Sequence, residues 1–112
     1  MSAYDNLTRL GISLPAVTPP VAAYVPFVQT GNLVFISGHV AKKDGKPLQG
    51  QLGKSMTTAE GREAARGVAI DLIGTLQAAT GDLNHVARIV NLTVLVNSSP
   101  DFTEHHLVAN GA

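Results

Sequence analysis

The sequence has 112 residues, enough for one domain that can bury a core without disulfides or metals. Hydrophobic residues make up 45% and charged residues 14%, which is too apolar and too lightly charged for intrinsic disorder. The lack of cysteine excludes a disulfide framework, a thiolate zinc site and a cysteine nucleophile. A formal net charge of zero argues against nucleic acid as a partner. No segment resembles a signal peptide or a membrane span, so we expect a cytoplasmic protein.

The N-terminal region contains a helical pattern followed by a proline-rich stretch. Tyr4, Leu7 and Leu10 recur at helical spacing and Gly11 is a suitable stop, which predicts a short helix or turn over Tyr4–Leu10. Four of the six prolines lie between Pro15 and Pro26. Because proline lacks the amide hydrogen and disfavours helix, this stretch is expected to be an extended arm.

Two dipeptides, Gly31-Asn32 and Asp44-Gly45, tolerate the positive φ that two-residue hairpin turns require. They separate three runs that are predicted to form antiparallel strands, the third short and weak: Val25–Thr30, Leu33–Val40 and Lys46–Leu52. In the second run the side chains alternate between two faces. Val34, Ile36 and Val40 share one face, and Leu33, Phe35, Ser37 and His39 share the other.

A long helix is the clearest predicted element. Thr57 and Glu60 have the spacing of a capping box, and Gly81 stands where a helix ends in a left-handed residue. Between them small and aliphatic residues recur at steps of three and four, which predicts a stripe buried against the sheet that includes Leu72 and Leu76.

Ala87–Asn97 alternates apolar and polar residues with a period of two, which predicts another strand. One face of the sheet is then expected to carry the helix, while the other bears Ser37, His39, Asn91 and Thr93 among apolar neighbours. A half-polar face of this kind suits a ligand cleft or a subunit interface. The residues alone therefore indicate an α/β (α+β) domain with one large helix on a sheet, and leave its chemistry undetermined.

The four histidines, His39, His85, His105 and His106, do not form a helical metal-binding pattern, so no metal site is expected. Ser37 and His39 could be read as a nucleophile and its base, but no orienting carboxylate accompanies them. The simpler interpretation is that both form hydrogen bonds at a strand edge. An isolated tyrosine such as Tyr24 in a proline-rich arm most often serves packing.

Tyr24-Val25-Pro26, followed by the segment from Gly31 to His39 (GNLVFISGH), resembles the signature of the RidA family, also called YjgF or L-PSP. The order of the remaining motifs agrees: a hairpin, an alanine-rich helix, Gly-Asp-Leu at Gly81, a strand, and Pro-Asp-Phe at Pro100. The opening motif YDxLxxLGIxLP resembles one branch of the family, which carries an endoribonuclease label. This resemblance covers essentially the whole chain, read as a single domain over residues 1–112.

The resemblance implies a chorismate mutase-like fold, a homotrimer, and a ligand cleft between neighbouring subunits. It also implies hydrolysis of enamines and imines, such as 2-aminoacrylate, to 2-keto acids and ammonia without a cofactor. An arginine of the family binds the substrate carboxylate. By this match Ser37, Gly38 and His39 would line the cleft and Tyr24 would close it. Asn110 would match a family asparagine at the start of a second helix.

Two departures from the family pattern stand out. His39 replaces the usual glutamine, and none of the arginines (Arg9, Arg62, Arg66 and Arg88) lies in the motif of the carboxylate-binding arginine. Relative to the family, we expect the domain to be incomplete at its C-terminus, with an open strand edge, so its catalytic residues stay unassigned. Two alternatives to a deaminase are a non-catalytic ligand-binding or regulatory trimer and an endoribonuclease or translation inhibitor.

Overall fold

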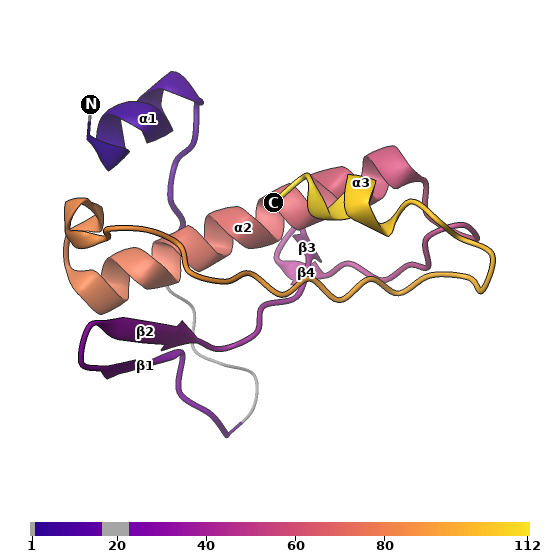
Figure 1. The fold of residues 1–112 in the computed structure, drawn as a ribbon. Coiled ribbons are helices and arrows are strands. Elements are labelled where there is room, and N and C mark those ends of the chain that lie inside the picture. The colour runs from indigo at the N-terminus through magenta and orange to yellow at the C-terminus, as the bar shows by residue number, and fades with distance from the viewer. Residues whose placement is uncertain (1, 17–22) are drawn as a thin grey trace. The chain divides into compact units, whose positions relative to one another are not determined.

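The computed structural model describes residues 2–16 and 23–112, and its longest element is α2, from Thr58 to Thr80 (Figure 1). The chain divides into two units. The first consists of Met1–His39 and Ile70–Val90, and the second of Val40–Ala69 and Asn91–Ala112. α2 therefore contributes its C-terminal half to the first unit and its N-terminal half to the second. The middle of the expected proline-rich arm, residues 17–22, lies outside the described residues.

Both predicted ends of α2 are confirmed. The backbone N–H of Glu60 donates to Thr57 Oγ1 at 3.2 Å, and the N–H of Thr57 donates to Glu60 Oε1 at 3.0 Å, which completes the capping box. At the other end Gly81 has a φ of +74° and donates its N–H to the Gln77 carbonyl at 2.8 Å. The helix thus begins and ends where its local sequence satisfies the unpaired backbone groups.

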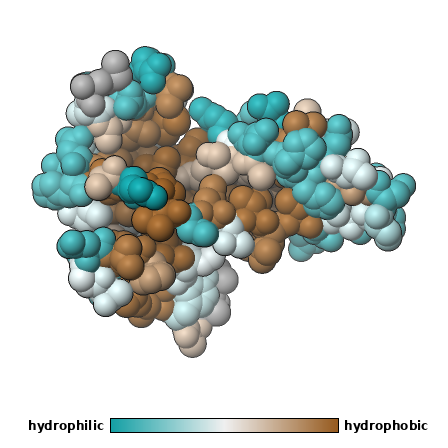
Figure 2. All heavy atoms as spheres, in the orientation of Figure 1, coloured by the Kyte–Doolittle hydropathy of each residue, from teal (hydrophilic) through white to brown (hydrophobic). Residues whose placement is uncertain are grey.

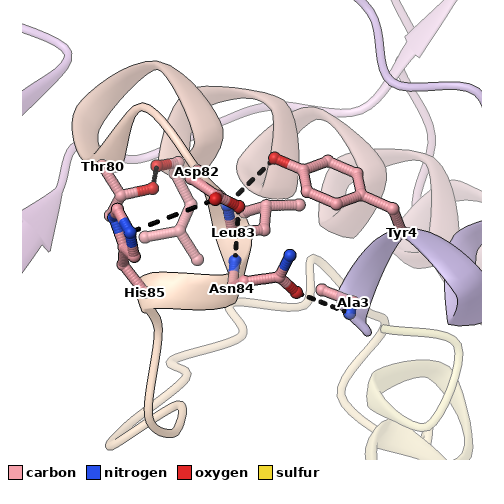
Figure 3. A network of polar contacts seen from close by, with 8 residues as sticks. Ala3, Tyr4, Thr80, Asp82, Leu83, Asn84 and His85 are labelled. Atoms are coloured by element: carbon pink, nitrogen blue, oxygen red, sulfur yellow. Dashed lines mark hydrogen bonds and ion pairs between the residues drawn. The ribbon is translucent and has the colours of Figure 1, made fainter. Parts of the chain in front are cut away.

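In the first unit the N-terminal helix α1 (Ala3–Arg9) lies against the 3-10 helix η1 (Leu83–His85), as Figure 3 shows. The N–H of Leu83 donates to the Tyr4 hydroxyl at 3.1 Å, and the N–H of Ala3 donates to Asn84 Oδ1 at 3.0 Å. In each helix a backbone N–H thus donates a hydrogen bond to a side-chain oxygen of the other helix. The predicted helix at Tyr4–Leu10 is confirmed to within one residue.

The first predicted hairpin is confirmed as β1 (Phe27–Thr30) paired with β2 (Leu33–Ile36). Gly31 takes a positive φ of +55° in the turn, as the hairpin requires. In β2, Val34 and Ile36 are half-buried, whereas Leu33 and Phe35 are exposed. Figure 2 shows apolar residues at the surface over this hairpin. The two faces of β2 therefore differ as the alternation predicted.

The second turn is confirmed, but the prediction of three successive strands in one sheet is wrong. Asp44 and Gly45 both have positive φ, +53° and +76°, and they join β3 (Lys42–Lys43) to β4 (Lys46–Pro47). This pair forms a sheet of its own. β2 does not reach Val40, because the side chains of Ser37 and His39 hydrogen-bond to backbone and to α2 and the chain leaves the ladder.

The core of the second unit forms at Gly61, where α2 has no side chain. A Cβ on Gly61 would lie 2.8 Å from Leu52 Cδ1 and 3.0 Å from Val108 Cγ2, so both side chains pack directly on the helix backbone. Val108 belongs to α3 (His105–Ala109). Within the described residues, the buried apolar side chains are Leu52, Leu83 and Val108.

Leu72 and Leu76 are half-buried, which is less than the sequence predicts. A helix stripe is buried fully only when a broad sheet lies beneath it, and the described strands form two separate sheets of two strands each.

No helix among residues 2–16 and 23–112 combines the length and the hydropathy that a membrane crossing needs.

The predicted strand at Ala87–Asn97 is not formed. Among the described residues no backbone hydrogen bond reaches Ala87–Val96; the first is at Asn97, whose carbonyl accepts the N–H of Leu52 at 2.9 Å. The alternating pattern is suited to a strand, but a strand forms only when a neighbouring strand hydrogen-bonds to its backbone. Four of its apolar side chains stay exposed instead: Ile89, Val90, Leu92 and Leu95.

Candidate functional site

The chain directly after β2 is held on one side by Ser37. Its N–H donates to the Pro26 carbonyl at 3.0 Å, and its hydroxyl donates to the Val25 carbonyl. Both bonds join this segment to the residues that lead into β1. The Ser37 hydroxyl is therefore a fixed structural donor, in agreement with the simpler interpretation of its sequence context.

The imidazole of His39 anchors the same segment to α2. Its Nδ1 lies 2.9 Å from the Ser37 carbonyl oxygen, and its Nε2 lies 3.1 Å from Thr75 Oγ1 on α2. A carbonyl only accepts, so Nδ1 carries the proton and, in a neutral ring, Nε2 accepts the Thr75 hydroxyl proton. The expectation that His39 lies on the face opposite the helix is wrong, because the strand alternation stops at Ile36.

Between these two anchors Gly38 is exposed, and a Cβ placed on it would meet nothing within 4 Å. Within the described part of the chain, the N–H groups of Gly38 and His39 have no hydrogen-bond acceptor. Tyr24 lies one residue before the Val25 anchor and is 45% exposed. Four of the predicted site residues (Tyr24, Ser37, Gly38 and His39) thus belong to one unit, with free backbone donors between fixed side chains.

Asn110 lies in the other unit. The prediction that it opens a helix is wrong: α3 begins at His105 and Asn110 is its C-cap. The turn at Pro100 and Asp101 allows α3 to start earlier than the family match suggested, since helices begin readily after such turns. Asn110 lines a hollow together with Arg62 and Arg66 of α2.

The remaining histidines do not gather into a metal site: among the residues that the structure describes, no cluster of His, Asp or Glu could hold an ion. His85 is exposed and lies 4.0 Å from the Asp82 carboxylate. His105 was missed by the sequence analysis as a partner of serine. Its Nε2 lies 2.8 Å from Ser98 Oγ, and its ring meets Phe102 edge-on with centroids 5.0 Å apart. The sequence did not predict this pair, because two residues seven positions apart meet only through the turn between them.

Comparison with known proteins gives consistent results. A family model described as "YjgF/chorismate_mutase-like, putative endoribonuclease" matches residues 5–112. The curated "Protein TCP17" of Trypanosoma cruzi is 51% identical over 108 residues, which is 96% of this chain and 68% of that protein.

Two solved structures share the fold. A crystal structure of a "putative endoribonuclease" from Shewanella oneidensis has a TM-score of 0.92 at 30% identity, over 99% of this chain and 74% of that one. A protein of unknown function from Agrobacterium tumefaciens has a TM-score of 0.83 at 37% identity, over 96% of this chain and 66% of that one. The predicted fold class, antiparallel strands with a long helix, is confirmed by these likenesses. With the family model spanning all but the first residues, the chain belongs to the YjgF/chorismate mutase-like family.

Proposed function

We propose that this protein is an enamine/imine deaminase, or a close relative, whose ligand binds at the Gly38–His39 backbone. The reaction would convert a 2-aminoacrylate-type intermediate to its imine. Water would then add to the C=N carbon, and ammonia would leave to give a 2-keto acid. Family membership supports the reaction class, and the segment after β2 supports the place. No cofactor is required, because addition of water to an imine is a polar step that hydrogen-bond donors can assist.

The observation that carries this proposal is the pair of N–H groups at Gly38 and His39, which have no acceptor among the described residues and lie next to two anchored side chains. Preorganised backbone donors can stabilise a carboxylate or the negative charge that develops on a carbonyl oxygen. Because the hydrogen bonds of Ser37 and His39 already hold this segment in place, little conformational entropy is lost at these donors when a ligand binds. Gly38 leaves the approach open, since it presents no side chain.

The same hydrogen bonds argue against a serine nucleophile. The Ser37 hydroxyl proton is engaged by the Val25 carbonyl, and His39 Nδ1 faces the Ser37 carbonyl rather than its hydroxyl. A serine is activated when a base accepts its hydroxyl proton, and neither ring nitrogen of His39 is placed to do so. The nucleophile in this proposal is therefore water. Ser37 is a positioning residue, and Tyr24 would cover the bound ligand.

A non-catalytic ligand-binding protein is the second candidate, and one observation favours it. The residues hydrogen-bonded around Ser37, Gly38 and His39 include no arginine that could hold a substrate carboxylate. In this reading the same backbone donors bind a small ligand without turning it over. A homotrimer with ligand clefts between subunits is proposed in either case, since the apolar face of the hairpin is exposed.

A Gly38→Ala variant tests the site with little risk to the fold. The added methyl group meets nothing within 4 Å and the φ of Gly38 lies outside the positive range, so folding is expected to be unchanged. It would nevertheless shield the free N–H groups. Gly67→Ala is the matched control, because Gly67 is also exposed with open space around its Cβ and lies on α2. Ammonia release from freshly generated 2-aminoacrylate is measured for both.

Loss of turnover in Gly38→Ala but not in Gly67→Ala would support the deaminase. If neither the parent nor the variants release ammonia, a titration with pyruvate by NMR decides between the candidates. Shifts at Gly38 and His39 would then support the ligand-binding protein. Equal activity in all three proteins would contradict the placement of the site. RNA affinity that falls steeply with salt would favour the endoribonuclease alternative.

A further inference from the structure

A hollow of about 430 Å³ opens beside the N-terminal half of α2, and it is independent of the site proposed above. All of its lining residues belong to the second unit: Ala59, Arg62, Glu63, Arg66, Asn110 and Gly111. Its walls come from α2 and from the end of α3, two segments that are about 45 residues apart in sequence and meet only in the folded chain.

Two arginines are among the residues that line this hollow. Arg62 and Arg66 are four residues apart and therefore lie on the same face of α2. Within the described residues neither side chain forms a hydrogen bond or an ion pair, although Glu63 lines the same hollow. The guanidinium group has five N–H donors in a planar fork, which matches the two oxygens of a carboxylate or a phosphate.

The opposite wall is held in place by a close backbone contact. A Cβ on Gly111 would overlap the Arg62 carbonyl, so only glycine allows α3 to end so near α2. The adjacent Asn110 lines the hollow, and its side-chain amide has no partner among the described residues. An asparagine amide carries two further N–H donors.

We propose that this hollow is a binding site for a small oxyanion, a carboxylate or a phosphate, held by Arg62, Arg66 and Asn110. Two arginines against one glutamate leave a local charge of +1, which favours an anion. At the start of α2 the N–H of Glu60 is already engaged by the Thr57 hydroxyl. Recognition depends on the guanidinium forks and the amide.

The test uses the chain as it is, labelled with nitrogen-15, and follows the side-chain N–H signals of arginine and asparagine by NMR. Inorganic phosphate and acetate are titrated separately at constant ionic strength, with chloride as the reference salt. We expect saturable shifts at Arg62, Arg66 and Asn110. Saturation by phosphate alone would identify a phosphate site, and saturation by acetate alone a carboxylate site. Shifts that rise linearly and equally with all three anions would overturn the proposal.

Variants separate this site from general charge attraction. Arg62→Gln and Arg66→Gln should each weaken binding about tenfold, because a charge-assisted hydrogen-bonded pair is lost. Arg62→Lys should weaken it nearly as much, since lysine keeps the charge and loses the fork. Glu63→Gln should tighten binding. Arg88→Gln, which removes the same charge outside the hollow, should leave it unchanged. Equal weakening in Arg88→Gln and Arg62→Gln would refute a specific site.

Discussion

The Nε2 atom of His39 lies 3.1 Å from the Oγ1 atom of Thr75, and this bond joins the chain after β2 to the C-terminal half of α2. Thr75 is only 3% exposed and its hydroxyl has a second acceptor, the Asp71 carbonyl at 3.3 Å. In the neutral ring Nε2 accepts the Thr75 hydroxyl proton. The side chain of His39 therefore ties this segment to α2.

Thr75→Val should destabilise the first unit. Valine has the shape of threonine but cannot donate, so Nε2 of the half-buried His39 would lose its partner, at a cost of about 1–3 kcal/mol. Urea unfolding followed by circular dichroism measures the change. Thr80→Val is the control, because the Thr80 hydroxyl bonds only to the Leu76 carbonyl of its own helix. A loss in Thr80→Val as large as that in Thr75→Val would contradict the role of the His39 bond.

The capping box of α2 should make stability depend on pH in the acidic range. The backbone N–H of Thr57, followed by its hydroxyl, lowers the pKa of Glu60 below its ordinary value. Since the folded pKa is lower than the unfolded one, this stabilisation is present at neutral pH and is lost as the pH falls through the acidic range. Unfolding free energies measured from pH 7 downward should fall less steeply in Glu60→Gln than in the parent. Parallel curves would count against this prediction.

Gly61→Ala should destabilise the second unit, although alanine is the better helix former. The new methyl group would lie 2.8 Å from Leu52 Cδ1 and 3.0 Å from Val108 Cγ2, and overpacking of this kind costs about 1–3 kcal/mol. Gly67→Ala, on the same helix with open space around it, should instead stabilise by about 0.5–1 kcal/mol. Thermal unfolding of both variants checks the opposite signs. The same sign in both would mean that Leu52 and Val108 do not pack on Gly61.

The exposed apolar residues after η1 should drive self-association. Leu95 is 91% exposed, so Leu95→Lys removes apolar surface without disturbing packing. We expect this variant to shift sedimentation profiles towards the monomer at micromolar protein. Thr103→Lys adds the same charge at an exposed site of the same unit and should have no effect. A stable monomer in the parent protein would contradict both this prediction and the proposed homotrimer.

Local sequence determined the elements whose hydrogen bonds close within a few residues. The capping box at Thr57 and Glu60 set the start of α2, and Gly81 set its end. The turns at Gly31 and at Asp44-Gly45 were predictable because few residues accept a positive φ. The assignment of Ser37 and Gly38 to a ligand site came from the resemblance to the family and stays a prediction.

Tertiary structure decided everything that depends on a distant partner. The alternation of Ala87–Asn97 predicted a strand, but the ladder requires a neighbour that no local pattern supplies. His39 turned from its predicted face because its Nε2 hydrogen-bonds to the hydroxyl of Thr75, 36 residues away. The hollow lined by Arg62 and Arg66 exists only where the end of α3 meets α2. Local sequence determines backbone geometry over a few neighbouring residues. Strand pairing, burial and binding sites depend on contacts between residues far apart in the sequence, and these contacts form only when the chain folds.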